Sequence, residues 1–329
     1  MLAVQQCYVI KEAPGKGLGM FATRDIRRGE CILAESPLVY GTPDFIETQR
    51  AIDAMSPADK ESYFALHNVH SDLPAAIGIM KTNGLPLGVD SVECAVYKHA
   101  SRINHSCDPN VHHAWHSRPR KEYIHAIKDI AAGSEILTSY TVEFKVREER
   151  MTFLQQHFMF ECQCRLCATP SPEYDETVRR IKIYSDRIPP CASLQPRRSI
   201  QYVRDILALL DTIGGNGKTR FYYDAYQICA MYGDYNFAQK WADLLLESYI
   251  MDEGLDGDEY DVTCDTEMTP ARMNVPDVPH VKSFLRAIYR RQFNAQPSSI
   301  GCFIYSAIVS IKKSFALALG REGGGLRAP

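Results

Sequence analysis

The sequence predicts an α+β fold with a β-rich N-terminal half and an all-α C-terminal half. Residues 7–41 hold short apolar stretches broken by glycines and turns, a pattern typical of strands. From about Asp175 onward, helical periodicity dominates. Between the halves, three cysteines fall within six residues, at Cys162, Cys164 and Cys167. The chain is therefore expected to fold as two regions joined by a cysteine-rich segment.

Strands are expected in two parts of the N-terminal half. Apolar stretches at Tyr8–Ile10 and Cys31–Ala34 lie on either side of a turn around Arg27–Gly29. Residues 122–140 alternate between apolar and polar positions around a turn at Gly133. Both parts therefore predict short strands.

A helical insert is expected between these parts, at about residues 43–70. Ser56 is suited to cap a helix, Pro57 to occupy its first position, and Asp59 to favour its first turn. These signals predict a helix that begins at Pro57.

The C-terminal half is expected to be helical after a linker at residues 168–174. Residues 219–254 predict two helices joined near Gly233–Asp234. Their spacing of small and aromatic residues resembles a tetratricopeptide-like hairpin, although a plain helical domain fits the same pattern. The acidic segment 252–277 is expected to be a loop, and residues 321–329 a disordered tail.

The composition is that of an ordinary soluble globular protein, with 45% hydrophobic and 23% charged residues. A net charge of −3 gives no overall attraction to nucleic acid. We expect no secretory signal, because no apolar stretch follows a basic start. The longest apolar run, Ile300–Ile311, is too short to cross a bilayer. We expect no membrane partner, and a location in the nucleus and/or the cytoplasm, since the short basic run Arg118–Lys121 does not decide between them.

The cysteine cluster predicts a zinc site. Eleven cysteines are an odd number, and clustering without an export signal favours metal binding over disulfides. A C-x-C-x-x-C pattern brings three thiolates within reach of one ion, and zinc takes four ligands in a tetrahedron. The fourth candidate is Cys107, in the loop “RINHSCDPN” (Arg102–Asn110), which is the other segment with clear ligand chemistry.

Two other interpretations of these cysteines are open. The four could be unrelated buried thiols, as is expected for the remaining cysteines of the chain. Alternatively, Cys107 and His105 could be a nucleophile and its base. That pairing is weaker, because neighbours two positions apart on a loop seldom face each other and such partners usually come from distant positions.

The segment “GKGLGMFA” carries glycines at alternate positions, Gly15, Gly17 and Gly19. Glycines allow the backbone to approach a ligand closely. The third glycine is misplaced for a dinucleotide fingerprint, and the segment does not match a Walker loop. The alternative is a plain β-turn between two strands.

Four segments, in this order, resemble SET-domain protein lysine methyltransferases with a post-SET zinc motif: “GKGLGMFATRDIRRGE”, “RINHSCDPN”, “GSEILTSYT” and “FMFECQCRLC”. The resemblance covers about Val9–Cys167 and is greatest to the SET-MYND subfamily and its fungal relatives. Only Cys94 lies between Cys31 and Cys107, so the MYND zinc finger of that subfamily has no counterpart there. The resemblance implies a fold of small sheets with a pseudoknot, followed by a helical domain similar to tetratricopeptide-like hairpins.

The resemblance also implies a site for S-adenosylmethionine, whose product is S-adenosylhomocysteine. The backbone of the G-x-G segment would contact the cofactor, and the Asn-His dipeptide would hold its amino-acid and adenine portions. Asn83 is included because “KTNGLP” resembles another contact segment of the family. The implied cofactor contacts are Lys16, Gly17, Leu18, Gly19, Asn83, Asn104, His105, Tyr140, Phe158 and Phe160.

Catalysis and zinc binding are the other implied roles. Tyr140 matches the family's catalytic tyrosine, while Phe158 and Phe160 would cover the adenine and wall the lysine channel. The implied ligands of one structural zinc ion are Cys107, Cys162, Cys164 and Cys167. Taken alone, Tyr140 could be an ordinary strand tyrosine and the two phenylalanines core residues, or part of one face of an extended segment. Only the order of the motifs favours the functional interpretation.

The implied domains are a SET domain at 1–145, a post-SET zinc-binding segment at 146–168, and a helical domain at 169–320. The implied function is methylation of lysines in histone or non-histone proteins. We expect a monomer, a protein substrate that presents a lysine, partner proteins at the helical domain, and no direct nucleic acid. One alternative is a weakly catalytic SET scaffold that binds partners through the helical domain. Another, a zinc-dependent nucleic-acid binder, is disfavoured by the acidic charge balance and the lack of a basic-aromatic stripe.

Overall fold

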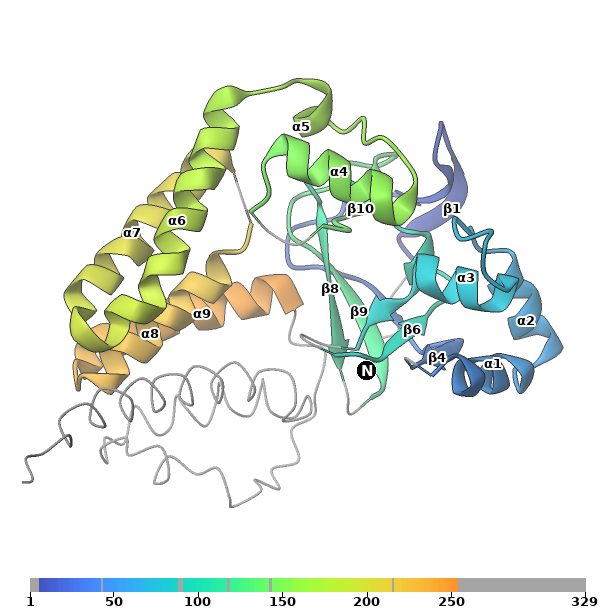
Figure 1. The fold of residues 1–329 in the computed structure, drawn as a ribbon, viewed down its shortest axis with the longest axis horizontal. Helices are drawn as coiled ribbons and strands as arrows, with labels where there is room; N and C mark the ends of the chain where they lie inside the picture. The colour runs from blue at the N-terminus through green and yellow to red at the C-terminus, as the bar shows by residue number, and fades with distance from the viewer. Residues whose placement is uncertain are drawn as a thin grey trace, which may run out of the picture.

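The computed structural model describes residues 6–42, 44–87, 91–116, 119–141, 144–214 and 216–253. Within these ranges, a unit of three small sheets lies beside two helical hairpins (Figure 1). The expectations for 254–320, including the apolar run Ile300–Ile311, and for the tail at 321–329 lie outside the described residues. Among the helices that the structure describes, none is long and apolar enough to cross a membrane.

The first sheet brings together segments that are far apart in the sequence. Its strands, in spatial order, are β1 (Tyr8–Ala13), β2 (Gly17–Ala22), β10 (Glu135–Thr138) and β7 (Asn104–His105). β1 and β2 form an antiparallel hairpin, and Gly15 and Gly17 in its turn have φ of +74° and +76°. β7 runs parallel to β10, with Asn104 opposite Leu137. The glycine segment and the Asn-His dipeptide are thereby placed on either side of one strand.

The other two sheets complete the β-rich unit. They are β3–β9–β8 (Cys31–Glu35, Lys121–Ala126, Val111–His116) and β4–β6–β5 (Val39–Gly41, Cys94–Val96, Leu85–Pro86). Met20, Ile32, Ile124 and Ile136 are at most 1% exposed and share one core. Burying an apolar side chain of this size contributes about 2 kcal/mol, so this core holds the sheets together.

The predicted strands and turns of this unit are confirmed. Tyr8–Ile10 lies within β1, and Cys31–Ala34 lies within β3. Gly29 and Gly133 have φ of +84° and +81°, a conformation that glycine adopts without strain. These glycines therefore form turns, Gly29 between β2 and β3 and Gly133 between β9 and β10.

The helical insert contains three helices and extends beyond the predicted range. These are α1 (Phe45–Asp53), α2 (Pro57–Phe64) and α3 (Ala75–Asn83). The predicted cap is confirmed, because the Ser56 side chain accepts a hydrogen bond from the backbone N–H of Asp59 at 3.2 Å. α3 has no side-chain cap, so no helix-start signal marked it in the sequence. It is buried over most of its length.

Two short helices flank the cysteine segment. α4 (Arg147–Phe158) precedes the cysteines, and α5 (Arg165–Ala168) contains the last of them. Glu149 closes the first turn of α4 by accepting a hydrogen bond from the N–H of Val146 at 3.1 Å. Met159 caps the C-terminal end of α4, and its left-handed φ of 58° turns the chain toward the first cysteine.

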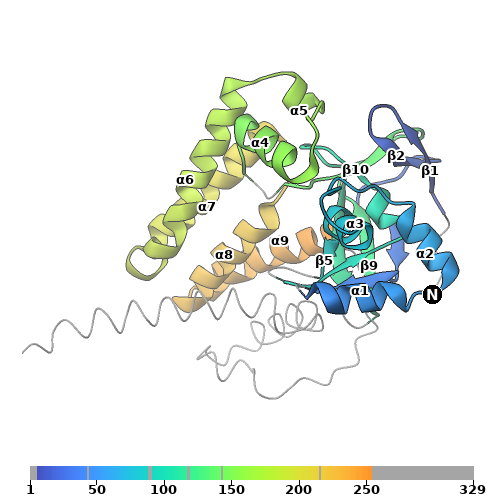
Figure 2. The ribbon, with the colours of Figure 1, turned by 45° about the vertical axis from the view of Figure 1, so that its right-hand side comes forward.

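The described C-terminal region consists of two helical hairpins that share one core (Figures 1 and 2). They are α6 (Pro172–Leu194) with α7 (Pro196–Ile213), and α8 (Lys218–Met231) with α9 (Tyr235–Glu253). The predicted junction near Gly233–Asp234 is confirmed. The linker predicted at 168–174 is shorter, because Ser171 caps α6 by accepting from the N–H of Tyr174 at 3.2 Å. α9 ends against β8 and β9, so the second hairpin packs on the β-rich unit.

Candidate functional site

The Asn-His dipeptide lies where two chain segments meet. The 3-10 helix η1 (Ala100–Arg102) leads into Ile103 and then into β7. The backbone N–H of Ser106 donates to the carbonyl of Thr138 at 2.8 Å, which continues the pairing with β10. The dipeptide is therefore fixed beside the residues that directly precede Tyr140.

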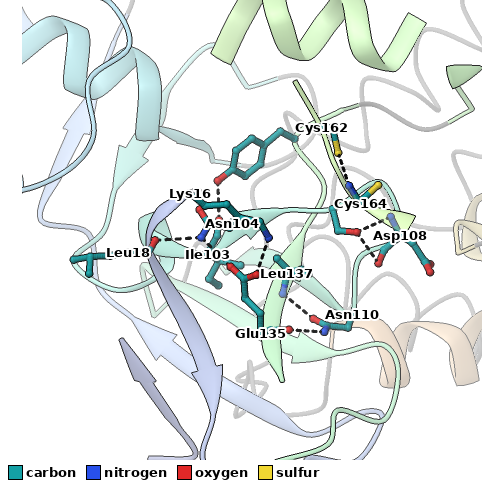
Figure 3. A network of polar contacts seen from close by, with 12 residues as sticks. Lys16, Leu18, Ile103, Asn104, Asp108, Asn110, Glu135, Leu137, Cys162 and Cys164 are labelled. Carbon is teal, nitrogen blue, oxygen red and sulfur yellow. Dashed lines mark hydrogen bonds and ion pairs between the residues drawn. The ribbon is translucent and has the colours of Figure 1, made fainter. Parts of the chain in front are cut away.

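Asn104 is held by its side-chain amide. Its Nδ2 donates to the Leu18 carbonyl at 3.2 Å and to Glu135 Oε1 at 2.9 Å. The other oxygen of Glu135 accepts a hydrogen bond from Lys16 Nζ at 2.7 Å (Figure 3). The structure thus brings together three predicted residues, Lys16, Leu18 and Asn104. It adds Glu135, which the sequence analysis missed because no local signal distinguishes this residue from its neighbours in the strand.

The glycine segment is both a turn and a close approach. Gly15 and Gly17 lie in the turn between β1 and β2, where added Cβ atoms would meet nothing within 4 Å. Gly19 differs, because a Cβ there would lie 2.8 Å from Asn104 Nδ2 and 2.8 Å from Glu135 Oε1. A side chain at position 19 would therefore displace Asn104 or Glu135.

His105 is 5% exposed, and both of its ring nitrogens have protein partners. Nδ1 accepts a hydrogen bond from the backbone N–H of Tyr140 at 2.9 Å, and Nε2 lies 3.3 Å from Cys107 Sγ. A backbone N–H can only donate, so the proton of the neutral ring is on Nε2 and points at sulfur. Burial lowers the pKa of His105 to about 4, which keeps the ring neutral. The ring therefore links the Asn-His strand to the cysteine cluster.

The expectation that His105 and Cys107 do not face each other was wrong. β7 ends at His105 and the chain turns through Ser106, which brings the imidazole against the thiol. The nucleophile interpretation is still not supported, because Cys107 Sγ also lies 3.5 Å from Cys167 Sγ and 4.0 Å from Cys162 Sγ. A sulfur with these neighbours has the surroundings of a metal ligand.

Tyr140 is fixed at both ends. Besides its backbone contact with His105, its hydroxyl donates to the Ile103 carbonyl at 2.8 Å. The Tyr140 ring centroid lies 4.8 Å from that of Phe158, and Phe160 lies 6.0 Å from His105. Burial raises the pKa of the Tyr140 hydroxyl, so this group is a neutral donor at physiological pH. The predicted tyrosine and both predicted phenylalanines therefore belong to one aromatic cluster.

Asn83 is a predicted site residue whose side-chain hydrogen bonds lie elsewhere. Its Nδ2 donates to the carbonyls of His67 at 2.7 Å and Ile79 at 2.8 Å, at the end of α3. Its own carbonyl accepts a hydrogen bond from Ser101 Oγ in η1 at 3.0 Å. The structure connects Asn83 to the Asn-His segment through this turn, and a cofactor contact at Asn83 stays a prediction.

The four predicted cysteines form one compact cluster. Their Sγ atoms, from Cys107, Cys162, Cys164 and Cys167, all lie within 4.8 Å of one another. Zinc–sulfur bonds of about 2.3 Å in a tetrahedron place sulfurs about 3.8 Å apart, which matches this spacing. Hydrogen bonding from the Cys107 thiol lowers the pKa of Cys167 to about 7 and also lowers that of Cys164. Spacing and donor chemistry both fit a zinc ion with four thiolate ligands.

This fold and this site have the features expected of a SET domain. Residues 17–141 match the SET domain family, and this range contains the glycine segment, the Asn-His dipeptide and Tyr140. The chain is similar to SET-domain protein lysine methyltransferases, among them members of the SET-MYND subfamily. The resemblance expected from the sequence is thereby confirmed.

Three relatives illustrate the relationship. The chain is 29% identical to histone-lysine N-methyltransferase set5 of Schizosaccharomyces pombe, over 78% of this chain and 82% of that protein. It is 26% identical to N-lysine methyltransferase SMYD2 of Mus musculus, over 42% of this chain and 31% of that protein. It is 32% identical to histone-lysine N-methyltransferase SMYD3 of Homo sapiens, over 26% of this chain and 20% of that protein. The matches thus span most of set5 but less than a third of SMYD2 or SMYD3.

Proposed function

We propose that this chain transfers a methyl group from S-adenosylmethionine to a lysine side chain of a histone or non-histone protein, in the nucleus and/or the cytoplasm. The observation that carries this proposal is the hydrogen bond from the Tyr140 hydroxyl to the Ile103 carbonyl, at 2.8 Å. Ile103 directly precedes Asn104 and His105 in the chain. The relatives set5, SMYD2 and SMYD3 bear the names of lysine methyltransferases, and the SET match covers this site.

The cofactor's proposed binding site lies between the glycine hairpin and the aromatic cluster. S-adenosylmethionine supplies an electrophilic methyl group, whose carbon–sulfur bond is exchanged for a carbon–nitrogen bond to lysine. At one end of this region Lys16 and Asn104 bind Glu135, and the Leu18 carbonyl accepts a hydrogen bond from Asn104, as Figure 3 shows. The absence of a side chain at Gly17, with open space around it, leaves room beside them. We assign the cofactor contacts to Lys16, Gly17, Leu18, Gly19, Asn83, Asn104, His105, Tyr140, Phe158 and Phe160.

The proposed role of the aromatic cluster is to receive the lysine amine and keep it neutral. An ordinary lysine has a pKa near 10.4 and is protonated at pH 7, so it must lose its proton to solvent before attack. Desolvation by Tyr140, Phe158 and Phe160, together with repulsion from the sulfonium, disfavours the charged amine. The Tyr140 hydroxyl is placed to align the amine for in-line transfer, since orientation contributes much of the rate.

The proposed role of zinc is structural. The four cysteines would hold one ion and fix the segment between α4 and α5, which contains Phe160. Leu154 of α4 is fully buried against the same cluster, which ties that helix to the metal segment. We also propose a SET domain at 1–145, a post-SET zinc-binding segment at 146–168 and a helical domain at 169–320. A pseudoknot in the SET domain and a tetratricopeptide-like character of the helical hairpins are part of the same proposal.

A methyl-transfer assay with isotopically labelled S-adenosylmethionine tests the proposal. Purified histones and a lysate from the protein's own source serve as substrates, and mass spectrometry locates the labelled lysines. We expect labelled lysine in at least one protein, and calorimetric binding of S-adenosylhomocysteine to the enzyme. An absence of both binding and transfer would contradict the proposal.

One observation favours the scaffold alternative as a second candidate. The second hairpin exposes large apolar side chains, with Met231, Phe237 and Leu244 each more than 40% exposed. Such residues are typical of partner-binding surfaces when they lie together. A chain that binds a protein partner through this hairpin, but neither binds S-adenosylhomocysteine nor transfers methyl groups, would be a scaffold.

A further inference from the structure

The orientation of the Asn104 carboxamide is dictated by its neighbours. Nδ2 has two partners, the Leu18 carbonyl at 3.2 Å and Glu135 Oε1 at 2.9 Å. A carbonyl and an ionised carboxylate accept hydrogen bonds and cannot donate them. The amide nitrogen must therefore face Leu18 and Glu135, which turns Oδ1 away from both of them.

Glu135 is itself well fixed. Lys16 Nζ binds its second oxygen at 2.7 Å, and the Glu135 side chain is 15% exposed. Its backbone carbonyl accepts a hydrogen bond from Asn110 Nδ2 at 2.9 Å, and the next residue, Ile136, is fully buried. Hydrogen bonds to an ionised group are about twice as strong as neutral ones, so Glu135 restrains Asn104 more firmly than the Leu18 carbonyl does.

Gly19 provides an independent observation on the same contact. A Cβ at position 19 would lie 2.8 Å from both atoms of the Asn104–Glu135 hydrogen bond. The φ angle of Gly19 is outside the left-handed region, so its backbone conformation would accept alanine. Glycine at this position is therefore needed for the space between Asn104 and Glu135, and not for its backbone conformation.

We propose that Glu135 is a positioning residue that, through Asn104, presents the Asn104 Oδ1 atom to the α-ammonium group of the bound cofactor. This inference rests on the proposed function, because it requires the cofactor's amino-acid portion at this place. Without Glu135 only the weaker hydrogen bond to the Leu18 carbonyl opposes rotation of the carboxamide. Rotation would place its NH2 group, a donor, where the ammonium needs an acceptor. The adenosine portion has no α-ammonium, so its binding is independent of this device.

Two ligands separate this role from a general structural one. S-adenosylhomocysteine contains the amino-acid portion, whereas 5′-methylthioadenosine lacks it. Calorimetry on the full chain, with weak binders measured by displacement of S-adenosylhomocysteine, compares wild type with Glu135→Leu and Gly19→Ala. We expect each variant to bind S-adenosylhomocysteine about tenfold or more weakly, the effect of one lost charge-assisted hydrogen bond. Binding of 5′-methylthioadenosine should stay within about twofold.

Further variants make the test specific. Glu135→Gln retains an acceptor for Asn104 and should restore most of the affinity. If Glu135→Leu does not fold, Gly19→Ala alone tests the loss of this contact. The double variant Glu135→Leu/Gly19→Ala should lose no more affinity than either single variant, because both act on one contact. The matched control is Glu30→Leu, which removes the carboxylate that pairs with Arg24. It should leave the affinities for S-adenosylhomocysteine and 5′-methylthioadenosine unchanged.

The outcomes are distinguishable. The role of Glu135 is overturned if the variants bind both ligands equally more weakly, or if their affinity for S-adenosylhomocysteine is unchanged. Either result leaves the proposed function intact. A wild-type chain that binds neither ligand overturns the proposed function itself.

Discussion

The Tyr140 hydroxyl donates a hydrogen bond to the Ile103 carbonyl at 2.8 Å, and the Tyr140 backbone N–H donates to His105 Nδ1 at 2.9 Å. The tyrosine is therefore held by the residues on both sides of Asn104. Because His105 also contacts Cys107, the hydroxyl, the Asn-His strand and the cysteine cluster are mechanically connected. A change in any one of them is expected to alter the positions of the side chains in the aromatic cluster.

Tyr140→Phe is expected to reduce methyl transfer sharply and to leave cofactor affinity and fold nearly unchanged. The substitution removes the hydroxyl that we propose aligns the amine but keeps the ring against Phe158. Loss of one neutral hydrogen bond should lower the free energy of unfolding by only about 1 kcal/mol. Single-turnover methyl transfer, calorimetry with S-adenosylhomocysteine and urea denaturation measure the three effects.

Tyr232→Phe is the matched control for this substitution. Its hydroxyl also donates to a backbone carbonyl, that of Ser193 at 2.7 Å, but in the helical hairpins. We expect a similar small change in stability and full activity. If Tyr140→Phe were as active as Tyr232→Phe, the catalytic assignment would be wrong.

Removal of zinc is expected to loosen the segment that carries Phe158 and Phe160. The purified chain should contain one zinc ion per molecule by elemental analysis, since the four sulfurs fit one tetrahedral site. Chelation, or Cys164→Ser, should lower the melting temperature and weaken binding of S-adenosylhomocysteine, because metal binding is coupled to folding. Cys191→Ser, outside the cluster, should change neither. A chain that binds no zinc when purified without chelators would refute this prediction.

The elements that could be predicted from the sequence are those with local signals. Ser56 before Pro57 marked the start of α2, and Gly233 marked the junction of α8 and α9. α3 could not be delimited, because it has no cap and is apolar over most of its surface, so its stability comes from burial against other elements. The start of α6 was placed too late, although Ser171 before Pro172 carries the same start signal as α2.

The site could be predicted in its members but not in its contacts. The four cysteines were predicted from their spacing and ligand chemistry, and Tyr140 from motif order; the structure brings the cysteines together. Glu135 was missed, because its contact with Asn104 depends on the parallel register of β7 and β10, which is set by tertiary packing. The contact between His105 and Cys107 depends on where β7 ends, and element ends are the least predictable part of a sequence reading.

Glu35→Ala is expected to lower both stability and turnover, although Glu35 lies outside the proposed cofactor contacts. Its carboxylate accepts hydrogen bonds from the N–H groups of Ala100 at 2.8 Å and His99 at 3.0 Å, at the start of η1. This turn ends at Ile103, whose carbonyl holds the Tyr140 hydroxyl. Two N–H groups left without this acceptor should cost about 1–3 kcal/mol. Denaturation and methyl-transfer kinetics measure the two effects.

Glu35→Gln and Glu12→Ala are the comparisons for this variant. Glutamine keeps one acceptor oxygen and should give an intermediate loss. Glu12 lies exposed on β1, and its removal should change neither stability nor turnover. Equal stability of Glu35→Ala and Glu12→Ala would show that the carboxylate does not support the turn.

Asp224→Asn is expected to stabilise the chain at alkaline pH and not at acid pH. Burial raises the pKa of the Asp224 carboxyl in α8 from 3.8 to about 6, although Arg220 partly opposes the shift. A raised folded-state pKa means that the protonated group's contribution is fully present below pH 3.8 and is lost as the pH rises through about 6. At pH 8 the folded chain therefore carries a poorly solvated carboxylate.

Asparagine removes that charge, so the free energy of unfolding at pH 8 should rise by about 1–2 kcal/mol, allowing for partial exposure of the site. Below pH 3.8 the aspartate is protonated in both states, so the gain should disappear. Urea denaturation at the two pH values measures the difference. Asp186→Asn, at an exposed position of α6, should show no such dependence on pH. An equal gain for Asp224→Asn at both pH values would mean that improved packing, and not removal of a buried charge, explains the effect.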